Sequence, residues 1–263
     1  LSVFLKAKAL EEEGKKIIHL EVGEPDFKPP KEVKTALEEV YDKGYGKYGS
    51  PKGITELLDK ILLHEGESLI GTGFTGEDLE VENIMVCPGA RFAVYLAIST
   101  LLNPGDEIIV IEPSWPAYKD CALNAGIKVR TIKTTLETKW EPSVEQINNA
   151  INENTKMIVL NYPNNPTGKI LPKKLLGDIV QTAKEHDLYV LSDEIYYHYF
   201  VSGRTAYVPD VEKYGYEKSI IIDSFSKSHA MTGFRIGYVV ADPSIIEKMS
   251  KLQALSLTNV SEP

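Results

Sequence analysis

Helix-like and strand-like segments alternate along most of this chain, and this alternation limits its fold more than any other feature. Several strand-like segments are apolar without interruption, among them 108–111 and 220–222. Unbroken apolar strands are typical of a sheet that helices cover on both faces. Repeated strand–helix–strand order also indicates crossovers between parallel strands. We therefore expect an α/β fold built on a mostly parallel, doubly wound sheet with helices on both faces.

The expected elements follow from apolar periodicity and from the glycine, proline and polar residues between them. Helices are predicted at 31–43, 54–64, 90–102, 115–124, 144–152, 173–185 and 245–255. Strands are predicted at 84–86, 107–111, 128–132, 157–161, 188–192, 219–223 and 235–240. Ligands of such sheets bind at the carboxyl ends of the strands. The loops where a site is expected are therefore 88–91, 113–115, 161–168, 193–197 and 224–227.

Composition narrows the class of protein. The length of 263 residues suffices for one large domain or two small ones. Acidic residues outnumber basic ones by 38 to 29, and the net charge of −9 argues against non-specific binding to nucleic acid or anionic membranes. No membrane-length apolar run, signal-peptide pattern or zinc-ligand spacing is visible. Together with only two cysteines, Cys87 and Cys121, this predicts a cytoplasmic protein.

The segment 71–76, Gly-Thr-Gly-Phe-Thr-Gly, matches the glycine pattern of a dinucleotide-binding turn. Its context does not fit, because no convincing strand precedes it and 77–83 is too short and acidic for the helix that should follow. We interpret the segment as a surface loop. A nucleotide-binding oxidoreductase is the least favoured function.

Three of the loops that follow strands carry residues with chemical potential. The run Pro88-Gly89-Ala90-Arg91 begins a helix, where backbone N–H groups favour a phosphate, although a simple tight turn would read the same way. The segment 161–168 forms a rigid turn that projects polar side chains such as Asn165. Asp193 lies where an apolar strand leaves the core, so its carboxylate needs a cationic or donor partner.

The segment 224–238 carries the most specific chemistry. Lys227 follows the apolar strand 219–223 at the expected ligand-binding edge. A partly desolvated lysine has a lowered pKa and can form a Schiff base. Arg235 lies close by in sequence, and a guanidinium suits bidentate binding of phosphate. Each residue alone would more simply be a solvated surface group.

Taken together, these segments resemble the class I aminotransferases of the aspartate aminotransferase-like group, which are fold-type I pyridoxal-phosphate enzymes. The resemblance runs through nearly the whole chain, in the order and spacing of that group. Its segments are 22–27, 45–53, 88–90, 165–168, 192–196 and 224–238. It implies a homodimeric transaminase of amino-acid metabolism or biosynthesis. Such an enzyme uses pyridoxal 5′-phosphate to move an amino group between an amino acid and a 2-oxo acid, without nucleic acid or membrane as a partner.

The resemblance also implies roles for single residues. Lys227 would bind the cofactor as a Schiff base and transfer the proton at the substrate Cα. Asp193 would pair with the pyridinium nitrogen. Asn165 and Tyr196 would contact the phenolic oxygen of the ring, and Trp115 would stack on its face. The remaining implied contacts are with the phosphate (Ser224, Arg235, Gly89, Ala90, added charge from Arg91, and Tyr48 across a dimer) and with the substrate carboxylate (the Gly23 backbone).

Members of that group are considerably longer than this chain. We expect 1–30 to be an N-terminal arm or part of a small domain, 31–263 to be the cofactor-binding large domain, and the C-terminal small domain to be absent or not represented in this sequence. In the group that domain carries an arginine for the substrate α-carboxylate, and no arginine follows Arg235 here. Two alternatives stay open, namely another fold-type I enzyme such as a C–S β-lyase and a non-catalytic cofactor-binding remnant. The amino donor and acceptor are not predicted.

Overall fold

A computed structural model describes residues 2–20, 22–44, 46–68, 79–198 and 216–262. Within these ranges the chain forms a seven-stranded sheet in the order β1-β7-β6-β5-β4-β2-β3. The strands are β1 (Ile84–Cys87), β2 (Glu107–Glu112), β3 (Lys128–Lys133), β4 (Thr155–Asn161), β5 (Tyr189–Asp193), β6 (Ser219–Ser224) and β7 (Gly237–Ala241). The α-helices are α1 (Ser2–Glu12), α2 (Lys31–Asp42), α3 (Thr55–Ser68), α4 (Ala90–Leu101), α5 (Ala117–Asn124), α6 (Val144–Ala150), α7 (Lys173–Glu185), α8 (Phe225–Ser228) and α9 (Pro243–Leu257).

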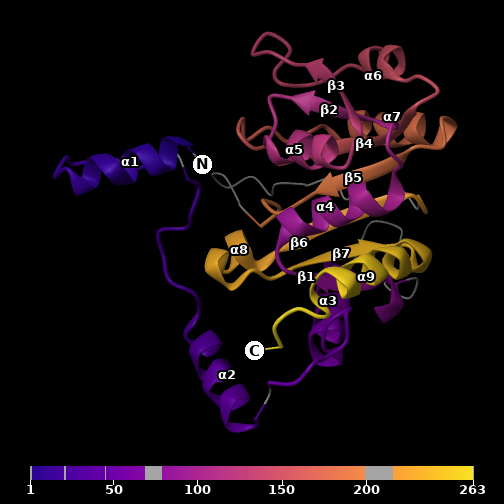
Figure 1. The fold of residues 1–263 in the computed structure, drawn as a ribbon. Coiled ribbons are helices and arrows are strands. Elements are labelled where there is room, and N and C mark those ends of the chain that lie inside the picture. The colour runs from indigo at the N-terminus through magenta and orange to yellow at the C-terminus, as the bar shows by residue number, and fades with distance from the viewer. Residues whose placement is uncertain (1, 21, 45, 69–78, 199–215, 263) are drawn as a thin grey trace.

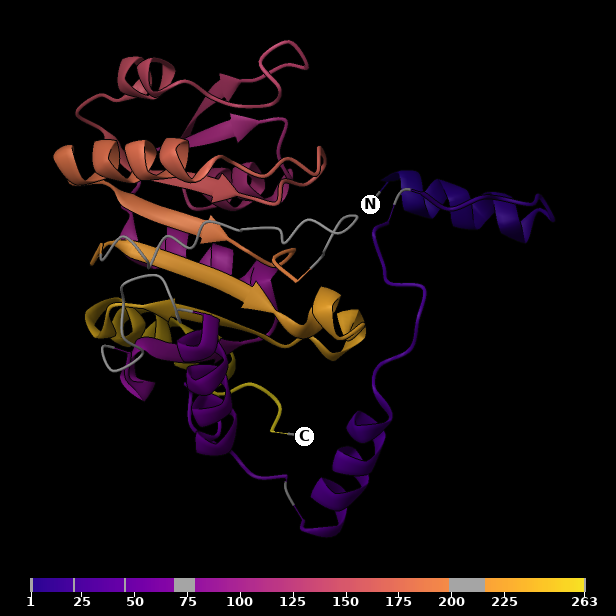
Figure 2. The ribbon, with the colours of Figure 1, turned by 180° about the vertical axis from the view of Figure 1, so that it is seen from behind.

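The sheet confirms the predicted fold class. Strands β3, β2, β4, β5 and β6 are parallel to one another in that spatial order. Strand β7 runs antiparallel to both of its neighbours, β6 and β1. Helices cover both faces: α4 and α9 lie in front of the sheet in Figure 1, whereas α7 and α3 lie in front of it in the opposite view of Figure 2.

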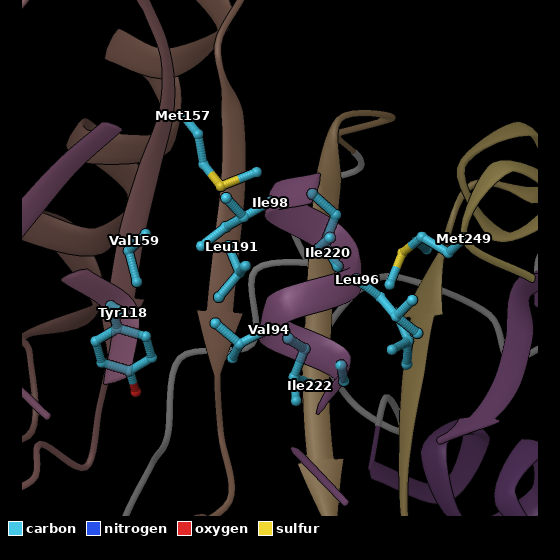
Figure 3. Close-up of a cluster of buried hydrophobic side chains, with 14 of the residues drawn as sticks. Val94, Leu96, Ile98, Tyr118, Met157, Val159, Leu191, Ile220, Ile222 and Met249 are labelled. Atoms are coloured by element: carbon cyan, nitrogen blue, oxygen red, sulfur yellow. The ribbon is translucent and has the colours of Figure 1, made fainter. Parts of the chain in front are cut away.

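The core is divided by the sheet into clusters on its two faces. One cluster joins α4, α5 and α9 to the strands, and Val94, Leu96 and Ile98 of α4 contribute apolar side chains to it (Figure 3). On the other face, α6 and α7 cover β2 to β5, and α3 covers β1, β6 and β7. Alternation along β6 sends Ile220 and Ile222 to the first face and Ile221 to the second.

Several elements begin at residues that differ from the sequence prediction, each for a local reason. Helix α5 begins at Ala117 rather than 115, after Pro116. Strand β7 begins at Gly237 rather than 235, because Arg235 adopts the left-handed conformation with φ 58°. Helices α1 and α8 were not predicted, because α1 has a weak amphipathic pattern and α8 has only four residues.

The N-terminal elements lie apart from the sheet in both views (Figures 1 and 2). Helix α2 has no buried residue, and Ile18 and Leu20 in the preceding segment are 81% and 90% exposed. The predicted division into an N-terminal segment, 1–30, and a large domain, 31–263, stays a prediction. The glycine-rich segment 71–76 lies outside the described residues. Among the described helices, none combines the length and apolarity needed to cross a bilayer.

Candidate active site

The topology brings the predicted loops to one edge of the sheet. Asn161 of β4 pairs with Asp193 of β5, which pairs in turn with Ile222 of β6, so these three parallel strands end side by side. The reversed strand β7 begins at the same edge, since Gly237 pairs with Ser224 on one side and with Cys87 on the other. The loops after β1, β4, β5 and β6 and the segment before β7 therefore meet.

Asp193 is a buried carboxylate at the end of β5, with 2% of its surface exposed. The Tyr118 hydroxyl donates to its Oδ2 at 2.6 Å, and the Ile195 N–H donates to its Oδ1 at 3.3 Å. Burial raises the pKa of Asp193 to about 7, against the lowering effect of these two hydrogen bonds. Its partners among the described residues are thus neutral donors, and a cation at this carboxylate would favour the charged form.

Asn161 links the ends of β4 and β5 to the turn that follows β4. Its Nδ2 donates to the Asp193 carbonyl at 3.0 Å, and its Oδ1 accepts the Asn165 N–H at 2.9 Å. The Asn165 side chain in turn donates to the Tyr196 hydroxyl at 3.2 Å. Two predicted site residues, Asn165 and Tyr196, are therefore in direct contact beside Asp193.

Lys227 lies on α8, directly after β6, and its side chain is partly buried. Its Nζ donates to the carbonyl oxygen of Gly23, so the structure brings these two predicted residues together across the fold. Burial lowers the pKa of Lys227, and the nearby Arg235 guanidinium lowers it further, whereas Glu24 raises it. A lysine in these surroundings is more readily deprotonated than a solvated one, as a nucleophilic amine requires.

Arg235 and Gly89 form a close contact at the N-terminus of α4. Gly89 has a φ of 86°, and a Cβ placed on it would lie 2.9 Å from the Arg235 Cζ. The absence of a side chain at Gly89 therefore lets the guanidinium lie against the first turn of α4. The Arg235 Nη1 also donates to the Thr232 carbonyl at 2.8 Å, which orients the group. A guanidinium beside a helix N-terminus is an arrangement that favours an anion.

Ser224 and Ala90 complete this corner. Ser224 caps α8, because its Oγ accepts the Ser226 N–H at 3.0 Å. Ala90 is the first residue of α4, and a Cβ placed on Gly237 would lie 2.9 Å from the Ala90 nitrogen. Gly237, to which the sequence reasoning gave no role, is therefore needed to let the α4 N-terminus approach β7.

Trp115 and Arg91 lie together beside Tyr118. The Arg91 guanidinium stacks over the Trp115 ring with Cζ 4.6 Å from the ring centroid. Trp115 meets the Tyr118 ring edge to face, with a centroid separation of 5.4 Å. Arg91 thus contacts an aromatic face, and its predicted contribution to phosphate binding stays a prediction.

Tyr48 is 87% exposed on the segment between α2 and α3. It contributes nothing to the corner formed by Lys227 and Arg235 in this single chain. The role predicted for it, across a dimer, stays a prediction.

Two residues of the site were not singled out from the sequence. Tyr118 is 1% exposed and supplies the donor that a buried Asp193 requires, and Asn161 ties the two strand ends together. A general signal existed for Tyr118, since a buried carboxylate needs a donor. Nothing in the sequence, however, indicated which of the many tyrosines it would be.

Comparison with known proteins agrees with this geometry. The aminotransferase class I and II family matches residues 15–263. An aspartate aminotransferase of Pyrococcus horikoshii is 38% identical over 93% of this chain and 61% of its own length. An asparagine–oxo-acid transaminase of Streptococcus mutans is 36% identical over 99% of this chain and 65% of its own length. The solved structure of a Thermus thermophilus aspartate aminotransferase with maleate superposes with a TM-score of 0.90 at 34% identity, over 99% of this chain and 66% of that one.

The fold is thus that of the aspartate aminotransferases, with the predicted lysine, aspartate and arginine on segments at the same edge of the sheet. The chain belongs to the aminotransferase class I and II family, as its motifs predicted. It spans less than two thirds of the length of the relatives compared above.

Proposed function

We propose that the protein is a pyridoxal-phosphate-dependent transaminase that moves an amino group between an amino acid and a 2-oxo acid. The observation that supports the proposal is that Lys227, Asp193 and Arg235 lie on neighbouring segments at one edge of the sheet. These three side chains offer an amine of lowered pKa, a buried carboxylate and a guanidinium at a helix N-terminus. Transamination needs that set of groups: a nucleophile, an acid partner and a phosphate anchor.

The residues present fit such a cofactor. The space that Gly89 leaves beside Arg235 and the α4 N-terminus suits a phosphate, because donors converge there. The buried Asp193, whose partners are neutral donors, suits a protonated pyridine nitrogen. Asn165 and Tyr196 would donate to the phenolic oxygen, and Trp115 would stack on the ring. When bound, pyridoxal phosphate supplies an electrophilic carbon and a ring that accepts electrons released at the substrate Cα.

Lys227 would perform two tasks in turn. Its amine would first bind the cofactor covalently, favoured by the lowered pKa that burial and Arg235 give it. Once the substrate amine displaces it, the free lysine would remove the proton from the substrate Cα and deliver a proton to the C4′ atom of the cofactor. The Lys227 Nζ donates to the Gly23 carbonyl, and we propose that the Gly23 backbone would also lie against the substrate carboxylate.

Relatives named for aspartate and for asparagine show that the substrate differs between similar chains. We therefore propose an amino acid and a 2-oxo acid as the substrate class, acted on by a homodimer to which Tyr48 contributes. Product analysis separates this reaction from a β-lyase, because the lyase releases ammonia and pyruvate whereas the transaminase forms a new amino acid and a 2-oxo acid.

Absorbance with borohydride reduction tests the proposal. Protein mixed with pyridoxal phosphate should show a visible-region band that reduction removes, with the adduct mapped to Lys227 by peptide mass. The Lys227→Ala variant should lose the band, the adduct and amino-group exchange. Lys218→Ala is the matched control, because Lys218 lies just before β6 at the opposite end of the same strand and pairs with Asp187. After incubation with excess pyridoxal phosphate and removal of the unbound cofactor, a flat spectrum would contradict the proposal.

A further inference from the structure

A second buried carboxylate, Asp223, lies one residue before Ser224 on the opposite face of the sheet from Asp193. Ile222, which pairs with Asp193, packs on the α4 side, whereas Asp223 follows Ile221 to the α3 side. Asp223 is 4% exposed. None of the roles proposed above uses this carboxylate, although burying a charge is costly without hydrogen-bonding partners.

Both oxygens of the Asp223 carboxylate have hydrogen-bonding partners, and these partners belong to different parts of the fold. Oδ1 accepts the N–H of Ser224 at 2.6 Å. Oδ2 accepts the Tyr238 hydroxyl at 3.1 Å and lies 3.3 Å from the His198 Nε2. One oxygen thus fixes the backbone that leads into α8, and the other is anchored to β7 and to the segment after β5.

Further titratable groups surround this carboxylate on every neighbouring element. The Tyr238 hydroxyl also donates to Glu65 of α3 at 2.6 Å, so one proton is shared between two carboxylates. His64 of α3 lies with its ring centroid 5.3 Å from that of His198. His229, directly after α8, has its pKa lowered by burial and by His198. The hydrogen bond to Asp223 raises the pKa of His198, which favours the protonated form of this imidazole beside the carboxylate.

We propose that Asp223 is a positioning residue that sets the place of Ser224 and Lys227 through its two-sided hydrogen bonds, with His198 and Tyr238 as its anchors. The catalytic importance of this positioning rests on the proposed function, whereas the hydrogen bonds of Asp223 are observed independently of it. Ser224 Oγ caps α8, and Lys227 is the third residue of that helix, so a shift of the Ser224 amide moves the whole helix. A helix of four residues is not stable alone, so its orientation depends on such tertiary contacts, to which the packing of Phe225 on Tyr238 also contributes.

Replacement of Asp223 by asparagine is the informative change, since it keeps the shape and removes one acceptor and the charge. The amide oxygen can still accept the Ser224 N–H, but the NH₂ group then faces two donors, and His198 loses its charged partner. Glu107→Gln is the matched control. Glu107 is a buried carboxylate at the far end of the sheet with its own partners, Arg130 at 2.8 Å and Asn152 at 2.7 Å.

Two readouts test the positioning role. The first is the dissociation constant for pyridoxal phosphate, which we expect to rise about tenfold in Asp223→Asn, because a displaced Ser224 would lose its hydrogen bond to the phosphate. The second is the pH dependence of reductive methylation at Lys227 by formaldehyde and cyanoborohydride, mapped by peptide mass, in protein free of cofactor. If α8 loosens and Lys227 becomes more exposed, its pKa rises toward the ordinary value and half-maximal labelling moves to higher pH. Glu107→Gln should move neither readout, although it lowers thermal stability.

The outcomes separate the positioning role from the proposed function. Equal effects of Asp223→Asn and Glu107→Gln on both readouts would overturn the positioning role. Wild-type protein that never binds pyridoxal phosphate would contradict the proposed function, and the labelling profile alone would then decide the positioning role. Should Asp223→Asn fail to fold, the double variant Tyr238→Phe with His198→Gln weakens the anchoring of Oδ2 while leaving Asp223 in place, and the same two readouts apply.

Discussion

The Tyr118 hydroxyl donates to the Oδ2 of Asp193 at 2.6 Å, joining the buried face of α5 to the end of β5. Both side chains are at most 2% exposed, so water has little access to either. Burial and the charge of Asp193 hold the pKa of Tyr118 well above its ordinary value, and the phenol therefore remains a donor throughout the physiological range. Among the groups around Asp193, the Tyr118 hydroxyl has the largest lowering effect on the pKa of this carboxyl, which burial raises.

Tyr118→Phe should raise the pKa of Asp193 and leave its Oδ2 without that donor. Loss of a hydrogen bond to a buried charged group costs about 1–3 kcal/mol, so the free energy of unfolding at pH 8 should fall by that amount. Affinity for pyridoxal phosphate should fall about tenfold. Urea unfolding and cofactor titration measure the two effects. Tyr95→Phe, the same change on α4 where the ring packs on Phe92, is the control. Equal effects of the two variants would contradict a specific role for Tyr118.

Gly89→Ala should weaken binding of phosphate-bearing ligands through a collision with Arg235. The added Cβ would lie 2.9 Å from the Arg235 Cζ, and a φ of 86° strains any L side chain. Gly105→Ala is matched for strain alone, because Gly105 has a φ of 100° and nothing within 4 Å of an added Cβ. Both variants should lose about 1 kcal/mol or more of stability. Calorimetric titration with pyridoxal phosphate should show a loss of affinity only for Gly89→Ala.

The pH dependence of stability should reveal Asp193. Its folded pKa of about 7 lies above the unfolded value, so between about pH 4 and pH 7 the folded state binds a proton that the unfolded state has lost. Stability of the cofactor-free protein should therefore fall as pH rises through this range. Asp193→Asn should remove that contribution, on the order of 4 kcal/mol. Urea unfolding at pH 5 and pH 8 provides the measurement, and an unchanged pH slope in the variant would show that Asp193 is already ionised at pH 5.

His198 should give a second pH-dependent contribution. Its folded pKa is raised by the hydrogen bond to Asp223 and by the charges of Asp223 and Glu65, despite its partial burial. The resulting stabilisation is fully present below the unfolded pKa of about 6.5 and is lost as pH rises through the folded pKa. The stability difference between wild type and His198→Gln should shrink over that rise. His186→Gln, at the end of α7, is the control. A difference that is constant with pH would contradict the His198–Asp223 pair.

The strand-end loops could be predicted because each follows an uninterrupted apolar run and contains glycine, proline or polar residues. This identified the neighbourhoods of Asp193, Asn165 and Lys227 without any knowledge of tertiary contacts. The parallel register then brings the ends of β4, β5 and β6 together. Those predictions depend on local patterns that a single sequence carries.

The partners across the fold could not be predicted, since they depend on which face a side chain occupies. The run Ile220-Ile221-Ile222-Asp223 has no alternation, so the sequence does not indicate that Asp223 points away from Asp193. The donor role of Tyr118 depends on the way α5 packs against the sheet. The reversal of β7 was likewise missed, because an apolar strand reads the same in either direction.

Because β7 runs antiparallel to β6, the segment between these strands starts and ends at the same edge of the sheet. Ser224 of β6 pairs with Gly237 of β7, so both ends of the segment that carries Lys227 and Arg235 are held by the same pair of the antiparallel ladder. Exchange of 224–237 between relatives would therefore carry the amine and the guanidinium together, with their spacing preserved.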